Sequence, residues 1–452
     1  MKNHPIRAVG GVLLALVLTG CWPQQGGGPA NTRVNRLETE LTREDAASLS
    51  EHWRTPIDSI ITEPIVAGGQ LYTTNRAHDD GGSLLDVLGV QAYDPATGGL
   101  IWERSLLPTE GDPVAGGIET PAFVDGALWV PYSHDGLAGC GGELVRLDPA
   151  TGAVLSADPT GRYPSAVVAA DSIVAYTEVH CGGGVRLVVR DQQTRAIRWS
   201  HTFTVGGSGA TPTIAGGRVF LRIGDTLQAF ALSGCGASVC GPLWTEHVPN
   251  WPFGDRPIAG PAGSLITIGA PSAGAPHTVI VRDARTGAIR WQAEPRYTGT
   301  QPGAITGVAV AGDTVYVAGA RGGGGSPDNQ AILDAYAAGG CGEAVCAPTW
   351  TAELGETRPA RAPTVAGGVV YVPLVAGSAT APAVAAVDAG GCGSSACGEL
   401  GRVPLVPGPG PFIEQAQPYV TSVAEGRLFV GWLPSLHGST LSELVAVGSP
   451  PG

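Results

Sequence analysis

The stretch that decides the fold, Val90 to Trp102, reads Val-Gln-Ala-Tyr-Asp-Pro-Ala-Thr-Gly-Gly-Leu-Ile-Trp. An apolar strand leads into an Asp-Pro-x-Thr-Gly turn, and a second strand ends in tryptophan. Proline presets φ for the turn and glycine accepts a positive φ, so the chain reverses within about five residues. The same cassette returns with variations at Leu144–Leu155, Leu187–Trp199 and Val279–Trp291. The chain therefore reads as one unit copied many times.

Each unit also has a first half, typified by Pro64–Tyr72, in which two alternating apolar strands flank a Gly-Gly turn. This pattern is typical of a β-hairpin. The copies align on one apolar residue of the hairpin, which is Tyr72, Trp129, Val174, Phe220, Ile266, Tyr316, Tyr371 or Phe429. The eighth unit lacks a fourth strand, whereas a spare tryptophan strand, Glu51–Thr55, precedes the first unit. We therefore predict an all-β, eight-bladed β-propeller of four-stranded antiparallel blades, with its ring closed by the N-terminal strand.

Large apolar residues recur in the fourth strand of every predicted blade. Six are tryptophans and two are leucines: Trp53, Trp102, Leu155, Trp199, Trp244, Trp291, Trp350 and Leu400. A repeated tryptophan is more typical of a core than of a binding site. We expect each one to dock against the neighbouring blade.

The N-terminus has the features of an export signal. Lys2 and Arg7 precede an apolar run that is too short to span a bilayer, and the run ends in Leu-Thr-Gly-Cys at Cys21. This resembles a bacterial lipoprotein signal, in which the cysteine is lipidated, with palmitate among the expected acyl groups; the alternative is an ordinary secretion signal. We predict a signal peptide over 1–21, a flexible tether over 22–40 and the propeller over 41–452.

The other eight cysteines suit an exported, oxidised protein. Six form three Cys-Gly-x-x-x-Cys loops, which replace the Asp-Pro-x-Thr-Gly turn in units four, six and seven. We predict the disulfides Cys235–Cys240, Cys341–Cys346, Cys392–Cys397 and Cys140–Cys181. Metal thiolates are the alternative, but the spacing fits no familiar zinc pattern.

Composition limits the classes of function. Charged residues make up 14% of the chain, glycine occurs 69 times and the net charge is −13, so a nucleic-acid footprint is absent. The localisation predicted from the signal is extracytoplasmic, with the protein attached to the membrane by its lipid. We expect a monomer.

The Asp-Pro-x-Thr-Gly-x-x-x-Trp cassettes resemble the repeats of quinoprotein-type propellers, a fold that PQQ-dependent dehydrogenases share with BamB-type envelope lipoproteins. The resemblance covers Glu51 to the C-terminus. For a dehydrogenase, the resemblance implies a pair of adjacent cysteines above the quinone, and Glu, Asn and Asp side chains around a calcium ion. This chain has no adjacent cysteines, so we predict no enzyme and no PQQ, calcium or other metal cofactor; a PQQ-dependent dehydrogenase remains the alternative.

The function predicted is a non-catalytic binding or scaffold platform for an envelope protein or glycan. The long loops between strands two and three and between blades share one face, where binding residues usually lie. Candidate binding residues on this face are His78, Asp79, Asp80, His134, Trp251, Phe253 and Trp432. Trp251 and Phe253 could equally pack their own loop onto the barrel. His78-Asp79-Asp80 could bind a divalent cation, although a solvated loop tip is the simpler reading.

Overall fold

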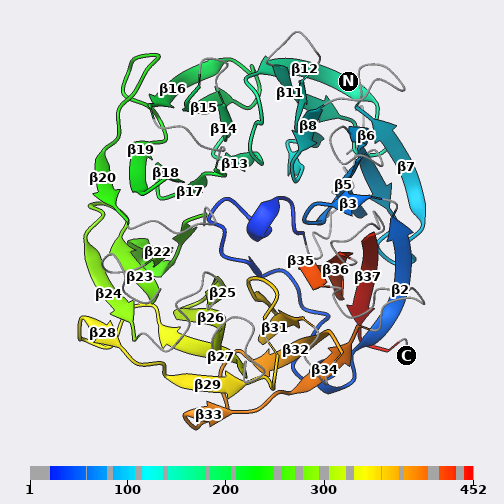
Figure 1. The fold of residues 1–452 in the computed structure, drawn as a ribbon, viewed down its shortest axis with the longest axis vertical. Coiled ribbons are helices and arrows are strands. Elements are labelled where there is room, and N and C mark those ends of the chain that lie inside the picture. The colour runs from blue at the N-terminus through cyan, green and yellow to red at the C-terminus, as the bar shows by residue number, and fades with distance from the viewer. Residues whose placement is uncertain are drawn as a thin grey trace, which may run out of the picture.

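The computed structural model describes residues 21–57, 59–78, 85–106, 115–135, 141–179, 183–204, 210–248, 256–269, 278–294, 305–321, 330–357, 359–375, 381–405, 417–433 and 442–450. Within them, eight separate sheets stand around one central axis (Figure 1). The predicted eight-bladed, four-stranded architecture is therefore confirmed.

The first four blades follow one another directly along the chain. Blade 1 holds β3 (Ile60–Ile61), β4 (Ile65–Ala67), β5 (Gln70–His78), β6 (Leu85–Tyr93) and β7 (Leu100–Ser105). Blade 2 holds β8 (Ala115–Ile118), β9 (Ala122–Val124), β10 (Ala127–Asp135), β11 (Gly141–Leu147) and β12 (Val154–Thr160). Blade 3 holds β13 (Val168–Ala170), β14 (Ile173–Val179), β15 (Val185–Asp191) and β16 (Ile197–Phe203). Blade 4 holds β17 (Thr213–Ala215), β18 (Arg218–Ile223), β19 (Thr226–Ala231) and β20 (Trp244–His247).

The last four blades each include a strand from elsewhere in the chain. Blade 5 holds β21 (Ile258–Ala259), β22 (Ser264–Gly269), β23 (Thr278–Asp283), β24 (Ile289–Ala293) and β28 (Val345–Cys346). Blade 6 holds β25 (Ile305–Ala311), β26 (Thr314–Arg321), β27 (Gln330–Ala337), β29 (Trp350–Glu353) and β33 (Ala396–Cys397). Blade 7 holds β30 (Thr364–Ala366), β31 (Val369–Leu374), β32 (Ala383–Asp388), β34 (Gly401–Pro404) and β1 (Val34–Asn35). Blade 8 holds β35 (Gln417–Ala424), β36 (Arg427–Leu433), β37 (Ser442–Gly448) and β2 (Ser50–Ile57). Three short 3-10 helices, η1 (Gln25–Gly27), η2 (Asp45–Ala47) and η3 (Pro261–Gly263), complete the described elements.

The ring closes as the sequence predicts. Strand β2 pairs antiparallel with β37 and supplies the outer strand of blade 8, with Trp53 opposite Ala446. The Trp53 indole then donates a 3.0 Å hydrogen bond to the carbonyl of Pro95, in the turn between β6 and β7 of blade 1. Blade 8 is thus joined to both ends of the chain, so neither end leaves an unpaired sheet edge.

Each outer-strand tryptophan docks on the next blade, as predicted. The indole N–H of Trp102 donates to Pro149 and that of Trp291 to Ala338, at 2.9 and 3.1 Å. The receiving turn carries a glycine, because a Cβ there would lie within 2.5–2.9 Å of the indole ring. These glycines, all with φ between 67° and 86°, are Gly98, Gly152, Gly234, Gly287, Gly340 and Gly391.

Blade 2 shows why that glycine is needed. Its docking position holds the small Ser156, which pairs with Arg146 as Trp102 pairs with Ala92; the expected Leu155 lies one residue earlier and is 52% exposed. The prediction for Leu400 requires the same correction, because Gly401 stands where blade 6 has Trp350. The facing turn of blade 3 has Arg195 where the other turns have glycine, at φ 63°. Arg195 instead pairs with Asp158 of blade 2 at 3.4 Å. The turn residue therefore follows the size of the side chain on the preceding blade.

Three predicted disulfides are formed: Cys235–Cys240, Cys341–Cys346 and Cys392–Cys397. Each closes a loop before the fourth strand, and each loop also reaches back to the preceding blade. Strand β28 pairs parallel with β24, and β33 with β29. The cystine loops therefore join neighbouring blades. Cys140 and Cys181 lie outside the described residues, as does the signal segment 1–20.

The flexible tether expected over residues 22–40 requires correction. Trp22 and Leu41 are fully buried, and β1 pairs parallel with β30. Figure 1 shows the segment in dark blue, crossing the centre of the ring. Its Gly-Pro-rich composition suggested a linker, but its carbonyls find partners on the blades, and these bonds order it.

Candidate functional site: a plugged central channel

Residues 22–35, here called the plug, bond to the innermost strand of every blade in turn. Trp22 pairs with Val66 of blade 1 through two hydrogen bonds of 2.8 and 3.0 Å. Successive plug oxygens then accept from Phe123, Ala169, Ile214, Ala259, Val310 and Val365, one from each of blades 2 to 7. At blade 8 the Asn35 side chain donates to the Val423 carbonyl at 2.7 Å. One segment thereby closes one end of the channel.

The sequence of the plug suits this path. Pro23 and Pro29 lack an N–H but keep the carbonyls that accept from blades 2 and 4. Gly26 has φ 73°, and a Cβ there would lie 2.1 Å from the Asn31 amide oxygen. Gly27 lies flat against the Trp22 ring, where a Cβ would be 3.2 Å away. The glycines that suggested flexibility are those that allow the tight course.

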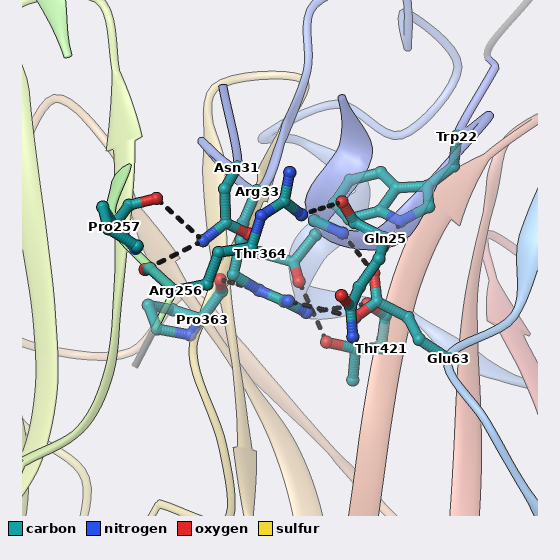
Figure 2. Close-up of polar contacts among 11 residues, drawn as sticks. Trp22, Gln25, Asn31, Arg33, Glu63, Arg256, Pro257, Pro363, Thr364 and Thr421 are labelled. Carbon is teal, nitrogen blue, oxygen red and sulfur yellow. Dashed lines mark hydrogen bonds and ion pairs between the residues drawn. The ribbon is translucent and has the colours of Figure 1, made fainter. Parts of the chain in front are cut away.

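Glu63, just before β4, is the polar centre of the plug (Figure 2). Its carboxylate accepts from the Trp22 indole at 2.9 Å, from the Gly26 N–H at 2.8 Å and from the Arg33 guanidinium at 3.2 Å. The Glu63 side chain is only 6% exposed. Hydrogen bonds to a buried charge are among the stronger ones in a protein.

Two arginines fix the plug to distant blades. Arg33 donates to the carbonyls of Pro363 in blade 7 and Thr421 in blade 8. Arg256, before blade 5, donates to Pro212 and to the plug carbonyls of Gln25 and Pro29, at 2.8, 2.7 and 3.2 Å. Burial lowers the pKa of Arg256 to about 9; Glu63 opposes this change and Arg33 adds to it. Arg256 therefore stays charged at neutral pH.

A cavity of about 400 Å³ lies in the central channel, against one side of the plug. Gln25, Asn31 and Arg33 form its floor. Its walls come from the starts of the innermost strands and the far ends of the second strands. These strand ends lie at the end of the channel where one blade connects to the next. The cavity is therefore on the side of the propeller that carries the long loops.

The cavity wall is polar and carries an excess of positive charge. Its charged residues are Arg33, Arg76, Arg256, Arg361, Glu63 and Glu119. Desolvation inside the channel raises the pKa of Glu119, although this residue is open to solvent, and Arg76 opposes that shift. Arginine provides planar paired donors for carboxylate or phosphate. In a chain of net charge −13, this cavity suits an organic anion.

The residues that line the cavity fit a metal-bound quinone less well than they fit a free organic anion. Among the described residues, no three His, Cys, Asp or Glu side chains gather as metal ligands. The two cavity carboxylates come from Glu63, which is engaged by the plug, and Glu119, which faces Arg76. The arginines could pair with a quinone's carboxylates, but this donor set does not fit calcium.

The predicted binding residues largely fall outside the described part of the chain. Asp79, Asp80, Trp251 and Phe253 lie in its gaps. The backbones of His78, His134 and Trp432 end or nearly end strands β5, β10 and β36, and their side chains are not described. These predictions remain untested.

The cavity residues were not identified from the sequence, because they are not part of the repeated pattern on which the predictions were based. A usable signal exists: a charged residue stands one or two positions before the proline that opens a blade. It is seen in Glu63-Pro64, Glu119-Thr-Pro121, Arg256-Pro257 and Arg361-Ala-Pro363. Each blade start faces the channel, so the charges converge there.

Blades, docking tryptophans and central channel together define an eight-bladed β-propeller. The family model described as "Outer membrane protein assembly factor BamB" matches residues 30–165 and 141–234. No curated protein sequence matches the chain significantly.

Solved structures share the fold at low identity. A europium-containing methanol dehydrogenase is 13% identical with a TM-score of 0.62, over 96% of this chain and 99% of that one. The quinohemoprotein alcohol dehydrogenase ADHIIG from Pseudomonas putida HK5 is 13% identical with a TM-score of 0.59, over 95% and 80%. The designed Ika8 protein is 13% identical with a TM-score of 0.55, over 89% and 99%.

These structures correct the prediction that the chain is not an enzyme. Two of them are dehydrogenases that match almost the whole chain. The missing pair of adjacent cysteines was therefore insufficient ground for excluding catalysis, because the same ring of blades carries enzymes. Separately, no helix among the described residues is long and apolar enough to cross a membrane.

Proposed function

We propose that this protein is an extracytoplasmic lipoprotein, anchored through acylated Cys21, whose propeller is a binding platform with its ligand site in the plugged channel. The description of the matching family, an outer-membrane assembly factor, supports an envelope location. The observation that carries the binding proposal is the cavity, which is lined by four arginines and closed on one side by the plug.

The ligand class follows from the wall chemistry. Arg33 and Arg256 already donate hydrogen bonds to backbone carbonyls, so they act on a ligand mainly through their positive charge. Arg76 lines the same cavity as Glu119, and we expect it to contact the ligand directly. A small polycarboxylate offers the planar charged groups that guanidinium binds well. The long loops that the sequence assigns to the blade-connection face would supply contacts to an envelope protein or glycan.

Citrate titration by calorimetry tests the ligand class. We expect saturable binding to the wild type and a loss of about 10- to 100-fold in affinity for Arg76→Gln, since a hydrogen bond to a charged group contributes about 1.5–3 kcal/mol. Arg321→Gln is the matched control, because Arg321 pairs with Glu353 outside the cavity. Absent citrate binding, or equal loss in both variants, would contradict the proposal.

Capture of partners from envelope extract tests the loop face. Trp251→Ala should weaken capture and leave the melting temperature nearly unchanged. Ala96→Arg, on the short-turn face, should leave capture unchanged. A lower melting temperature for Trp251→Ala without loss of capture would mean that the side chain packs its loop.

A PQQ-dependent dehydrogenase is the second candidate, favoured by the fold match to two such enzymes. Dye reduction with alcohols after addition of the quinone and calcium measures it. Turnover that depends on both would establish this candidate.

A further inference from the structure

The path of the chain places Cys21 at the end of the channel that carries the short turns. Strand β4 runs toward the Gly68–Gly69 turn, and Trp22 pairs with Val66 in antiparallel fashion. The residue before Trp22 must therefore lie beside Ala67, next to that turn. Burial and the charge of Glu425 raise the pKa of the Cys21 thiol. Glu425 belongs to the equivalent turn of blade 8, which agrees with this position.

No slack separates Cys21 from the propeller. Trp22 is fully buried, its backbone bonds to blade 1 and its indole bonds to Glu63. Consecutive Cα atoms are about 3.8 Å apart. Any group attached to the Cys21 sulfur is therefore held against the short-turn face.

The same end of the molecule carries most of the exposed apolar surface. Among the described residues, ten of the eleven large exposed hydrophobic side chains lie there, between 44% and 66% exposed. They begin the fourth strands, lie in the cystine loops or follow the plug: Leu37, Leu100, Ile101, Val154, Leu155, Ile197, Val239, Leu243, Ile289 and Val345. The eleventh, Tyr163, lies between blades 2 and 3 at the opposite end. We call the ten residues the apolar collar.

The charges beside the collar indicate which surface it suits. The turns that precede the fourth strands place Asp94, Asp148, Asp191 and Asp283 on this face. Arg198 and Arg290 pair with the last two, and no ion pair joins the first two to another described residue. An anionic lipid surface would be repelled by the other carboxylates, whereas a zwitterionic headgroup layer would not.

We propose that the short-turn face, with its apolar collar, rests on the zwitterionic headgroup layer of the bilayer that holds the Cys21 acyl groups, so that the channel cavity faces away from the membrane. This rests on the proposed acylation of Cys21. The acyl groups on Cys21 and the apolar collar act together, because insertion of the acyl groups brings the collar to the membrane surface.

Fluorescence quenching in vesicles tests the orientation. Full-length acylated protein is reconstituted in phosphatidylcholine vesicles containing spin-labelled lipid, with an environment-sensitive fluorophore at Val154→Cys or, as the control, at Tyr163→Cys. We expect a blue shift and loss of most emission at position 154, and neither at 163. Added phosphatidylglycerol should reduce the quenching at 154.

A variant with twenty Gly and Ser residues inserted between Cys21 and Trp22 tests whether the short link to the acylated cysteine holds this face on the membrane. That insert spans about 25 Å as a random coil. It should leave the protein acylated and membrane-bound but lose the quenching at 154. Quenching that is equal at 154 and 163, absent at 154, or unchanged by the insert would overturn the inference. The intact mass of each sample separates the two proposals: an unacylated sample contradicts the anchor, whereas an acylated sample without quenching at 154 contradicts only the orientation.

Discussion

Replacing Glu63 with glutamine should release the plug from the channel. The carboxylate accepts three hydrogen bonds, from Trp22, Gly26 and Arg33, and its side chain is only 6% exposed. Glutamine keeps one acceptor oxygen, turns an N–H₂ group toward the other donors and leaves the Arg33 charge without its counterion. Breaking a buried ion pair from one side costs about 3–5 kcal/mol.

The loss should appear as local opening of the plug. Taking about 3 kcal/mol, and one factor of ten per 1.4 kcal/mol, hydrogen exchange of residues 22–35 should accelerate on the order of 100-fold. Peptide-level exchange followed by mass spectrometry measures this directly. Glu119→Gln is the control, since Glu119 lines the same cavity and no described hydrogen bond joins its side chain to the plug.

Two results would refute this reasoning. One is a wild-type plug that already exchanges as fast as an unstructured peptide. The other is equal protection of residues 22–35 in Glu63→Gln and the wild type. The first would mean that the plug is not an integral part of the propeller and that Cys21 is not held against it. The second would mean that the Glu63 carboxylate does not hold the plug.

Three further predictions concern the blades. Trp291→Ala should lower the free energy of unfolding by about 3–5 kcal/mol because it empties a docking site, whereas Leu155→Ala, at a half-exposed position, should cost under about 1 kcal/mol; equal losses in denaturant melts would contradict interblade docking. Replacing both Cys341 and Cys346 with serine should cost about 2 kcal/mol by the entropy of a short closed loop, and an unchanged denaturation midpoint would show that the loop is held without its disulfide. The Arg290 hydrogen bond lowers the pKa of Asp283 from 3.8 to about 2, so the stabilising effect of Asp283 is present above pH 4 and is lost as the pH falls toward 2; the stability difference between wild type and Asp283→Asn should shrink over that interval, and a constant difference would count against the ion pair.

The ring could be predicted from the sequence because its information is local and repeated. Trp53 and the incomplete eighth unit together indicated the closing strand, and the repeated tryptophans indicated docking between neighbouring blades. Even the exception follows the same physics, since Arg195 replaces the glycine where the preceding blade has Ser156 in place of tryptophan. Repetition multiplies a weak local signal, which is why strand order and closure were accessible.

The plug and cavity could not be predicted in this way. The plug bonds mainly through its backbone carbonyls, which leave no side-chain pattern, and its glycines and prolines are equally typical of a linker. Glu63 and Arg256 lie 193 positions apart, and only the ring topology brings them to one site. The prediction that the chain is not an enzyme was wrong because a single missing motif was allowed to outweigh a fold that also carries dehydrogenases.

The most direct measurement is the intact mass of the mature protein extracted from membranes, together with the mass of its N-terminal peptide. We predict a chain that begins at Cys21 and carries acyl groups there, directly followed by the buried Trp22. A mature chain that begins elsewhere, or one that begins at Cys21 with an unmodified thiol, would contradict the proposed anchor and the orientation that depends on it.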